Sequence, residues 1–191
     1  MEIPKKELKS FLDLKVEMYN RNSFIASDPI QVPHQFSKKE DIEIAGFLSA
    51  TIAWGNRIMI IRNAKKMMEI MDNSPFDFIM NHSSKDLESI TGFVHRTFNS
   101  NDLQYFIKSL QNIYQNHGGL ESILKPSKGD INYQNSITEF KTIFLSKTFN
   151  SSATARPGKI CPPVPPAIIN NIGLIDFVIL LSALRLVCII N

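Results

Sequence analysis

The chain has 191 residues and a formal charge of +3, with 21 Lys and Arg against 18 Asp and Glu. That length suits one domain, or a domain with an appendage, and so mild a charge is typical of an ordinary solvated surface. Cys161 and Cys188 are the only cysteines and lack Cys-x-x-Cys spacing, which argues against a disulfide-stapled secreted fold and a structural zinc site. The N-terminal segment lacks the apolar run of a signal peptide, so a cytoplasmic protein is expected.

The N-terminal part of the sequence predicts one helix and a shaped connection. Apolar residues recur there at helical spacing, at Leu8, Phe11, Leu12 and Tyr19. The segment "DPIQVPHQF" (28–36) holds two prolines and therefore cannot continue a helix. Ser37 and Glu40 stand three residues apart just before an apolar run, which predicts a capping box at the start of the next helix.

A buried central helix and a sharp corner are expected next. The run "IEIAGFLSATIA" (42–53) is apolar almost all round, which is typical of a helix covered on every side. Trp54, the only tryptophan, and Gly55 follow this run, and Asn56 is a good N-cap for a third helix. The apolar stripe of that helix comprises Ile60, Ile61, Ala64, Met67, Met68 and Met71.

Four more helices are expected before residue 150. They are predicted over 75–81, around 85–90, within 100–119 and over 135–147. Ser74 and Pro75 place a cap and an N1 proline at the start of the first of these, and Gly118-Gly119 close the third. No segment shows sustained period-two alternation, so a sheet is not expected and the predicted fold class is all-α.

The composition changes abruptly near residue 150. Residues 151–191 contain four charged residues, whereas residues 1–150 contain 35. A Pro-rich stretch opens this tail and an apolar run, 172–190, almost completes it. We therefore expect a helical domain over 1–150 and a Pro-rich linker with an apolar tail over 151–191 that is not native to the domain.

Three origins of this tail remain open. The first is a membrane anchor, because 172–190 comprises 19 residues and is just long enough to span a bilayer. Against an anchor, Asp176 and Arg185 each cost about 2.5–3.5 kcal/mol near mid-span. The second is a buried terminal helix, although the run lacks a polar face. The third is a displaced sequence, as after a shifted reading frame or a truncated gene, which suits a Pro-rich and charge-poor segment.

Two resemblances follow from strings within the helical part. The segment "EDIEIAGFLSATIAWGNRIMIIRNAKKMMEIM" (40–71) resembles the opening of the helix-hairpin-helix DNA glycosylase superfamily, the endonuclease III-like fold. The matching residues are Leu48, Ser49 and Ala50, then Asn63, Ala64 and Lys65. Strings such as "DPIQVPH", "FVHRTFN" and "IYQNHGGLE" also resemble an uncharacterised bacterial (Bacteroidetes-type) family of unknown function over residues 1–125.

The glycosylase resemblance implies an incomplete domain of this fold. Members of that superfamily flip a base out of DNA and cleave its N-glycosidic bond, using a Gly-rich hairpin, an Asp in an Asp-x-His-like context and, in some, a Lys nucleophile. This chain contains neither Gly-x-Gly nor Asp-x-His, and the Pro-rich tail begins where those segments are due. The sequence therefore looks C-terminally truncated or frameshifted, no residue is assigned a catalytic role, and glycosylase activity is expected to be absent or severely reduced.

Candidate DNA-contacting residues come from the corner and from two loops. The resemblance implies that the corner faces double-stranded DNA, where Trp stacks on a base, Arg meets a phosphate and Gly permits close approach. The candidates are Trp54, Gly55, Asn56, Arg57, His34, His95 and Arg96. The plainer alternative is that Trp54 packs inward, Asn56 is a simple cap, and the two histidines satisfy local backbone groups.

Neither a metal nor a cofactor is expected. The four histidines show no His-x-x-x-His or Glu-x-x-His spacing, and no Gly-rich phosphate loop occurs. Asp41 and Glu43 show no arrangement that predicts a specific partner, so paired-carboxylate chemistry is not expected. The alternative to a DNA-binding protein is a small non-enzymatic helical protein anchored in a membrane through residues 172–190.

Overall fold

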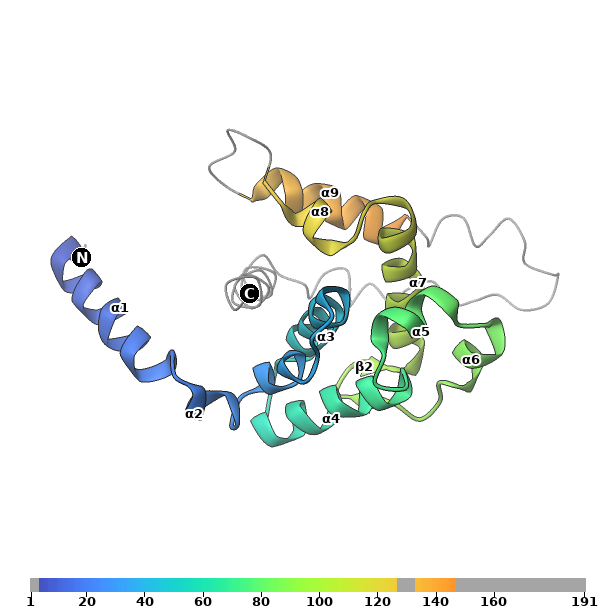
Figure 1. The fold of residues 1–191 in the computed structure, drawn as a ribbon, viewed down its shortest axis with the longest axis horizontal. Coiled ribbons are helices and arrows are strands. Elements are labelled where there is room, and N and C mark those ends of the chain that lie inside the picture. Colours follow the sequence, from blue (N-terminus) through green and yellow to red (C-terminus); the bar gives the residue numbers. More distant parts are fainter. Residues whose placement is uncertain (1–3, 127–132, 147–191) are drawn as a thin grey trace.

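Helices form almost all the regular structure of the residues that the computed structural model describes, 4–126 and 133–146 (Figure 1). The α-helices are α1 (Lys5–Tyr19), α2 (Asn22–Ile25), α3 (Lys39–Thr51), α4 (Arg57–Ile70), α5 (Pro75–Asn81), α6 (Ser84–Ser89), α7 (Ser100–Asn116), α8 (Leu120–Leu124) and α9 (Gln134–Leu145). Two 3₁₀ turns, η1 (Pro29–Gln31) and η2 (Pro33–Gln35), and two short strands, β1 (Val94–His95) and β2 (Phe98–Asn99), complete the order. The all-α prediction is confirmed, and so are the expected helices.

The centre of the fold is α3, as its apolar composition predicted. All seven residues from Glu43 to Ser49 are buried, and η1, η2, α4 and α5 contact this helix. The ring of Phe47 extends from α3 into an aromatic cluster, with ring centroids 5.8 Å from Phe106 on α7 and 5.7 and 5.8 Å from Phe140 and Phe144 on α9. This cluster joins three helices that are far apart in the sequence.

The end of α9 is fixed by side chains of α7. The hydroxyl groups of Tyr105 and Ser109 both donate hydrogen bonds to the carbonyl oxygen of Phe144, each at 2.9 Å. Carbonyl groups in the last turn of a helix have no partner within the helix, so these bonds satisfy one of them. The contact places α9 against the same helix that carries Phe106.

The expected cap of α4 is confirmed, whereas the expected capping box of α3 is wrong. Asn56 Oδ1 accepts hydrogen bonds from the amides of Ile58 and Met59, at 2.9 and 3.3 Å. At α3, however, the N-cap is Lys38, and no side chain caps it. The helix begins one residue later than a box from Ser37 to Glu40 requires, so this pair is out of register with the first turn.

Capping boxes occur instead at two other helices, and both use aspartate at the third helical position. Ser83 pairs with Asp86 at α6, and Asn99 pairs with Asp102 at α7. The usual capping-box template has Glu or Gln at that position, which explains why the sequence pattern did not identify them.

A small antiparallel sheet departs from the expectation that no strands form. Val94 pairs with Asn99 and His95 pairs with Phe98, which leaves a two-residue loop of Arg96 and Thr97. Strands of two residues are too short to produce visible alternation in a sequence. The hairpin matters here because it carries His95 and Arg96 toward the corner between α3 and α4.

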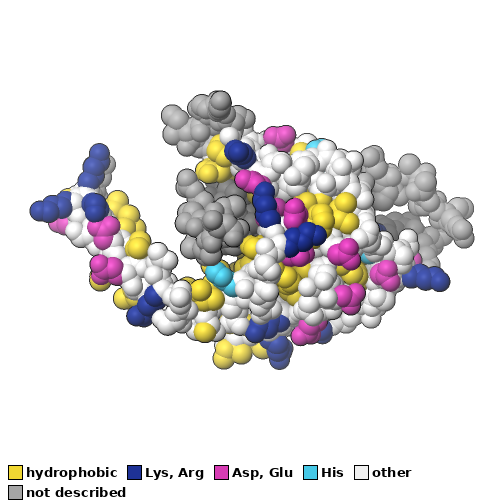
Figure 2. All heavy atoms as spheres, viewed as in Figure 1, with side chains coloured by type: hydrophobic (Ala, Val, Ile, Leu, Met, Phe, Trp, Pro, Cys, Tyr) yellow, Lys and Arg dark blue, Asp and Glu magenta, His cyan; other side chains and the backbone are white. Residues whose placement is uncertain are grey.

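The first helix forms as expected but presents its apolar residues to solvent. None of the residues of α1 is buried, and its large apolar side chains are 40–57% exposed. Figure 1 shows α1 extending away from the other helices, and Figure 2 shows hydrophobic side chains uncovered along it.

The tail predictions fall outside the described residues. These include the domain boundary at 150, the Pro-rich linker and the apolar run 172–190. Within 4–126 and 133–146, the helices are all too short or too polar to cross a membrane.

Candidate functional site

The corner between α3 and α4 is formed by a reversal of the backbone at Gly55. The amide of Trp54 donates to the carbonyl of Ile52 at 2.8 Å, which ends α3. Gly55 then adopts φ +110°, in a region that other residues rarely occupy. Asn56 caps α4 immediately afterwards. Ala53–Met59 are all exposed, so the corner is a surface feature.

The β1–β2 hairpin packs against this corner through His95. Its imidazole is 4% exposed and lies between two polar groups. Nδ1 is 2.8 Å from the side-chain amide nitrogen of Asn63 on α4, and Nε2 is 3.3 Å from the carbonyl oxygen of Trp54. With the Asn63 amide as donor, Nδ1 accepts, and the proton lies on Nε2 and points to the carbonyl.

The ring of Trp54 rests on the same imidazole. The two ring centroids are 5.7 Å apart at an interplanar angle of 72°, an edge-to-face arrangement that aromatic rings favour. The tryptophan nevertheless remains 39% exposed. One side of the ring therefore packs on His95 and the other is open to solvent. This placement is intermediate between the inward-packed and the fully presented tryptophan that the sequence left open.

Arg96 covers Gly55 closely. A Cβ atom on Gly55 would lie 2.7 Å from both Nε and Nη2 of Arg96, so no other residue fits at that position without displacing the arginine. Arg96 itself has φ +54°, an uncommon conformation for a residue with a side chain. This contact brings the guanidinium group of the hairpin to the corner.

Six of the seven predicted candidates thus gather at one place: Trp54, Gly55, Asn56, Arg57, His95 and Arg96. His34 does not join them through the contacts of the described residues, which show no hydrogen bond, ion pair or ring contact between His34 and this group. His34 lies on η2 with its side chain exposed. We call the surface formed by the six gathered residues except His95, which is buried beneath it, together with Ile58 and Val94, the corner surface.

The corner surface combines apolar and basic groups. Ile58 and Val94 are 75% and 62% exposed, and the guanidinium carbon of Arg57 lies 5.9 Å from the ring centroid of Phe24 on α2. From residue 52 to residue 68 the chain has four basic residues and no acidic one. Among the described residues, neither these four side chains nor that of Arg96 forms an ion pair. Figure 2 shows basic and hydrophobic side chains side by side along the α4 edge.

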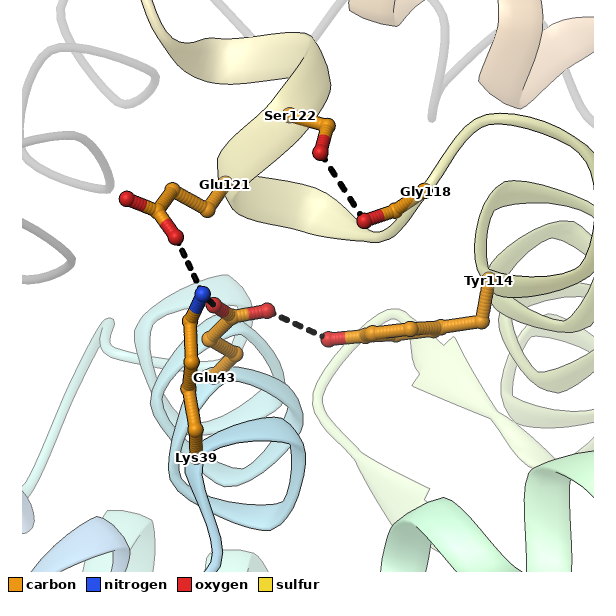
Figure 3. Close-up of polar contacts among 6 residues, drawn as sticks. All are labelled: Lys39, Glu43, Tyr114, Gly118, Glu121 and Ser122. Atoms are coloured by element: carbon orange, nitrogen blue, oxygen red, sulfur yellow. Dashed lines mark hydrogen bonds and ion pairs between the residues drawn. The ribbon is translucent and has the colours of Figure 1, made fainter.

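A second cluster, which the sequence did not predict, surrounds Glu43 on α3. Its side chain is only 6% exposed, and Oε2 accepts a hydrogen bond of 2.8 Å from the hydroxyl of Tyr114 on α7. Figure 3 shows the side chains of Lys39, Glu43, Tyr114 and Glu121 converging from α3, α7 and α8. The sequence pattern did not predict this partner of Glu43.

The other oxygen of this carboxylate is less well satisfied. Lys39 Nζ lies 3.7 Å from Glu43 Oε1 and hydrogen bonds instead to Glu121 on α8. Oε1 is buried and has no hydrogen-bond partner among the described residues. Asp41 on the same helix is satisfied differently, because its Oδ1 accepts from the amide of Phe76 at 2.8 Å.

The environment of Glu43 makes its carboxyl group harder to ionise than one in water. Burial raises the pKa of this carboxyl above its ordinary value, and the Tyr114 hydrogen bond and the Lys39 charge oppose the rise only in part. Burial and the neighbouring Glu43 charge likewise raise the pKa of Tyr114, which therefore stays a hydrogen-bond donor. One signal was available in the sequence, namely a single acidic residue inside the apolar run 42–53.

This shift predicts an acid-dependent part of the stability. Because the pKa of Glu43 is raised on folding, the folded state binds its proton more tightly than the unfolded state. The free energy of unfolding then falls as the pH rises from the ordinary glutamate pKa of 4.5 through the folded value. In Glu43→Gln this part of the slope, at most about 1.4 kcal/mol per pH unit for one group, should disappear.

Urea denaturation across a series of pH values measures this slope. Glu88→Gln on α6, an exposed residue, is the matched control and should keep the wild-type slope. Burial also raises the pKa of Asp102, so part of the slope should remain in Glu43→Gln. Identical slopes in the wild type and Glu43→Gln would contradict the assignment.

A metal ion in a protein is held by several ligand side chains that lie close together. Among residues 4–126 and 133–146, no group of three or more His, Cys, Asp or Glu side chains lies close enough together to hold a metal ion.

Comparison with known proteins places both clusters inside one family match. Residues 28–163 match the family described as protein of unknown function (DUF2400). No curated protein and no solved structure matches the chain.

Proposed function

The chain belongs to the DUF2400 family of proteins of unknown function, and from this premise we propose that it binds double-stranded DNA through the corner surface. The observation that carries the proposal is the packing of the β1–β2 hairpin on the corner, which lies about 40 residues away in the sequence. His95 contacts Trp54, and Arg96 covers Gly55, two residues before Arg57. An exposed aromatic ring on the same corner as two arginines is suited to stacking on a base while the arginines bind phosphates.

The packing beneath the corner surface supports a binding role. The His95 imidazole holds both the ring and the carbonyl of Trp54, so the tryptophan is oriented before any ligand arrives. Pre-orientation lowers the entropy lost on binding. Because Gly55 has no side chain, the guanidinium group of Arg96 lies directly beside its backbone, where it can bind a phosphate group.

We further propose that the fold is an incomplete relative of the helix-hairpin-helix glycosylases. The support is the resemblance of residues 40–71, which form α3, the corner and α4. Since the chain contains neither Gly-x-Gly nor Asp-x-His, the proposed role is DNA binding without base excision. Release of a base from a lesion-containing duplex by the purified chain would contradict this part of the proposal.

A salt titration tests DNA binding by the full chain. Fluorescence anisotropy of a labelled duplex, followed between about 50 and 200 mM salt, should give an affinity that falls steeply with salt. Each phosphate contact contributes about 0.9 to the slope of log K against log salt. The double variant Arg57→Ala/Arg96→Ala should therefore lower the slope by about 1.8, whereas Trp54→Ala should weaken binding by about 1–3 kcal/mol and leave the slope unchanged.

A matched pair of lysines provides the control. Lys85 on α6 and Lys141 on α9 are exposed, and both helices lie away from the start of α4 (Figure 1). Lys85→Ala/Lys141→Ala removes the same amount of charge as the arginine variant. Because these lysines lie away from the corner surface, this variant should keep the larger part of the wild-type slope. An affinity that does not respond to salt, or equal slopes for the two double variants, would overturn the proposal.

A further inference from the structure

The pocket beside Glu43 is separate from the corner surface and has its own chemistry. It has a volume of about 180 Å³ and is lined by Lys39, Glu40, Glu43, Phe76, Tyr114 and Gly118. Sites for drug-sized ligands measure about 300–1,000 Å³, so this pocket is of a size for a molecule of only a few heavy atoms. Its walls come from α3, α5, α7 and the loop that leads to α8.

The buried oxygen Glu43 Oε1 shows that a hydrogen-bond donor is missing. A buried carboxylate oxygen without a donor is costly, and native structures contain few such atoms. Lys39 Nζ, at 3.7 Å, is beyond hydrogen-bond distance, and Glu121 takes its hydrogen bond. Tyr114 already donates to the other carboxylate oxygen. A donor from outside the chain is therefore the group that this site lacks.

The charges and rings around the pocket favour a cation. Three carboxylates, those of Glu40, Glu43 and Glu121, lie around it against the two ammonium groups of Lys38 and Lys39. Phe76 and Tyr114 form an edge-to-face pair with centroids 5.3 Å apart, and such ring faces attract cations. The ring of Phe76 already has one cation over it, because Lys38 Nζ lies 4.1 Å from its centroid.

We propose that this pocket binds a small organic ammonium ion, which donates a hydrogen bond to Glu43 Oε1 while its alkyl part lies against Phe76 and Tyr114. The ligand replaces the ammonium group of Lys39, whose side chain is 55% exposed. The ion pair between Lys39 and Glu121 is itself on the surface, and such pairs contribute little to stability. Lys39 therefore moves aside at low cost.

The loop between α7 and α8 packs closely against the ring of Tyr114. Gly119 has φ +95°, and a Cβ atom there would lie 2.9 Å from Cε1 of Tyr114. The loop thus passes directly behind the ring that donates to Glu43, and the ring is held in place.

An NMR titration of the full 191-residue chain tests the proposal. The probe is n-butylammonium chloride at about pH 7, where the amine is charged, and the neutral comparison is 1-butanol. Butylammonium should shift the amide resonances of Glu43, Gly118 and Gly119 in a saturable way, with a dissociation constant of about 1 mM for so small a ligand. Butanol should leave these resonances in place.

Three variants separate a binding role from a purely structural one. Glu43→Gln should abolish the shifts, whereas Glu88→Gln on α6 should retain them. Lys39→Met should tighten binding by about tenfold, because it removes the competing ammonium group. A merely structural Lys39 would not produce that gain. Equal shifts with butanol, unchanged binding by Glu43→Gln, or weaker binding by Lys39→Met would each overturn the proposal.

Discussion

Phe47→Ala is expected to lower the free energy of unfolding by about 3–5 kcal/mol. The side chain is 2% exposed and its ring touches those of Phe106, Phe140 and Phe144. Truncation removes the transfer free energy of a buried ring and leaves a cavity between three helices that can close only in part. Urea denaturation followed by circular dichroism measures the loss.

Phe11→Ala is the matched control for this substitution. Phe11 lies on α1 and is 55% exposed, so its truncation should change the free energy of unfolding by less than about 0.5 kcal/mol. Comparable losses from the two substitutions would show that the aromatic cluster is not the centre of the core.

The second large effect is expected at His95. His95→Ala leaves the Asn63 amide without its buried partner and removes the donor to the Trp54 carbonyl. A buried polar group without a partner costs about 1–3 kcal/mol, so the loss should be about 3 kcal/mol for the two together. Thermal and urea denaturation measure it, and DNA affinity should fall as well because Trp54 loses its support.

His34→Ala gives the comparison for His95→Ala. His34 is exposed on η2, and its removal should stay within about 0.5 kcal/mol of the wild type. If His95→Ala proves too unstable to study, His95→Gln keeps an amide that can reach one of the two partners and should lose less. A wild-type denaturation midpoint for His95→Ala would contradict the hydrogen-bond assignment.

Local rules predicted the helices well, because each depends on residues within a few positions. Asn56 caps α4 as its residue type indicates, and the apolar run 42–53 forms the buried helix α3. The predicted capping box at Ser37 failed for an equally local reason, since α3 begins at Lys39. The hairpin was missed because two residues per strand carry no periodic signal.

The site residues depended on contacts that no local pattern encodes. Tyr114 lies 71 positions from Glu43, and His95 lies 41 positions from Trp54. The resemblance selected the corner, and the position of His95 and Arg96 in an expected loop selected them separately, but only the fold joins them into one surface. One indication of the pocket at Glu43 was present in the sequence, namely an acidic residue within a run whose other residues are those of a buried helix.

The position of Trp54 has a spectroscopic consequence. It is the only tryptophan among 191 residues, and its indole lies edge-on to His95 with 39% of its surface exposed. Fluorescence excited selectively at tryptophan therefore reports on the corner between α3 and α4 and on no other part of the protein. A ligand that reaches this corner should change the emission wavelength or intensity, whereas butylammonium in the Glu43 pocket should leave both unchanged. The chain thus carries an intrinsic optical probe that distinguishes its two candidate sites without a label.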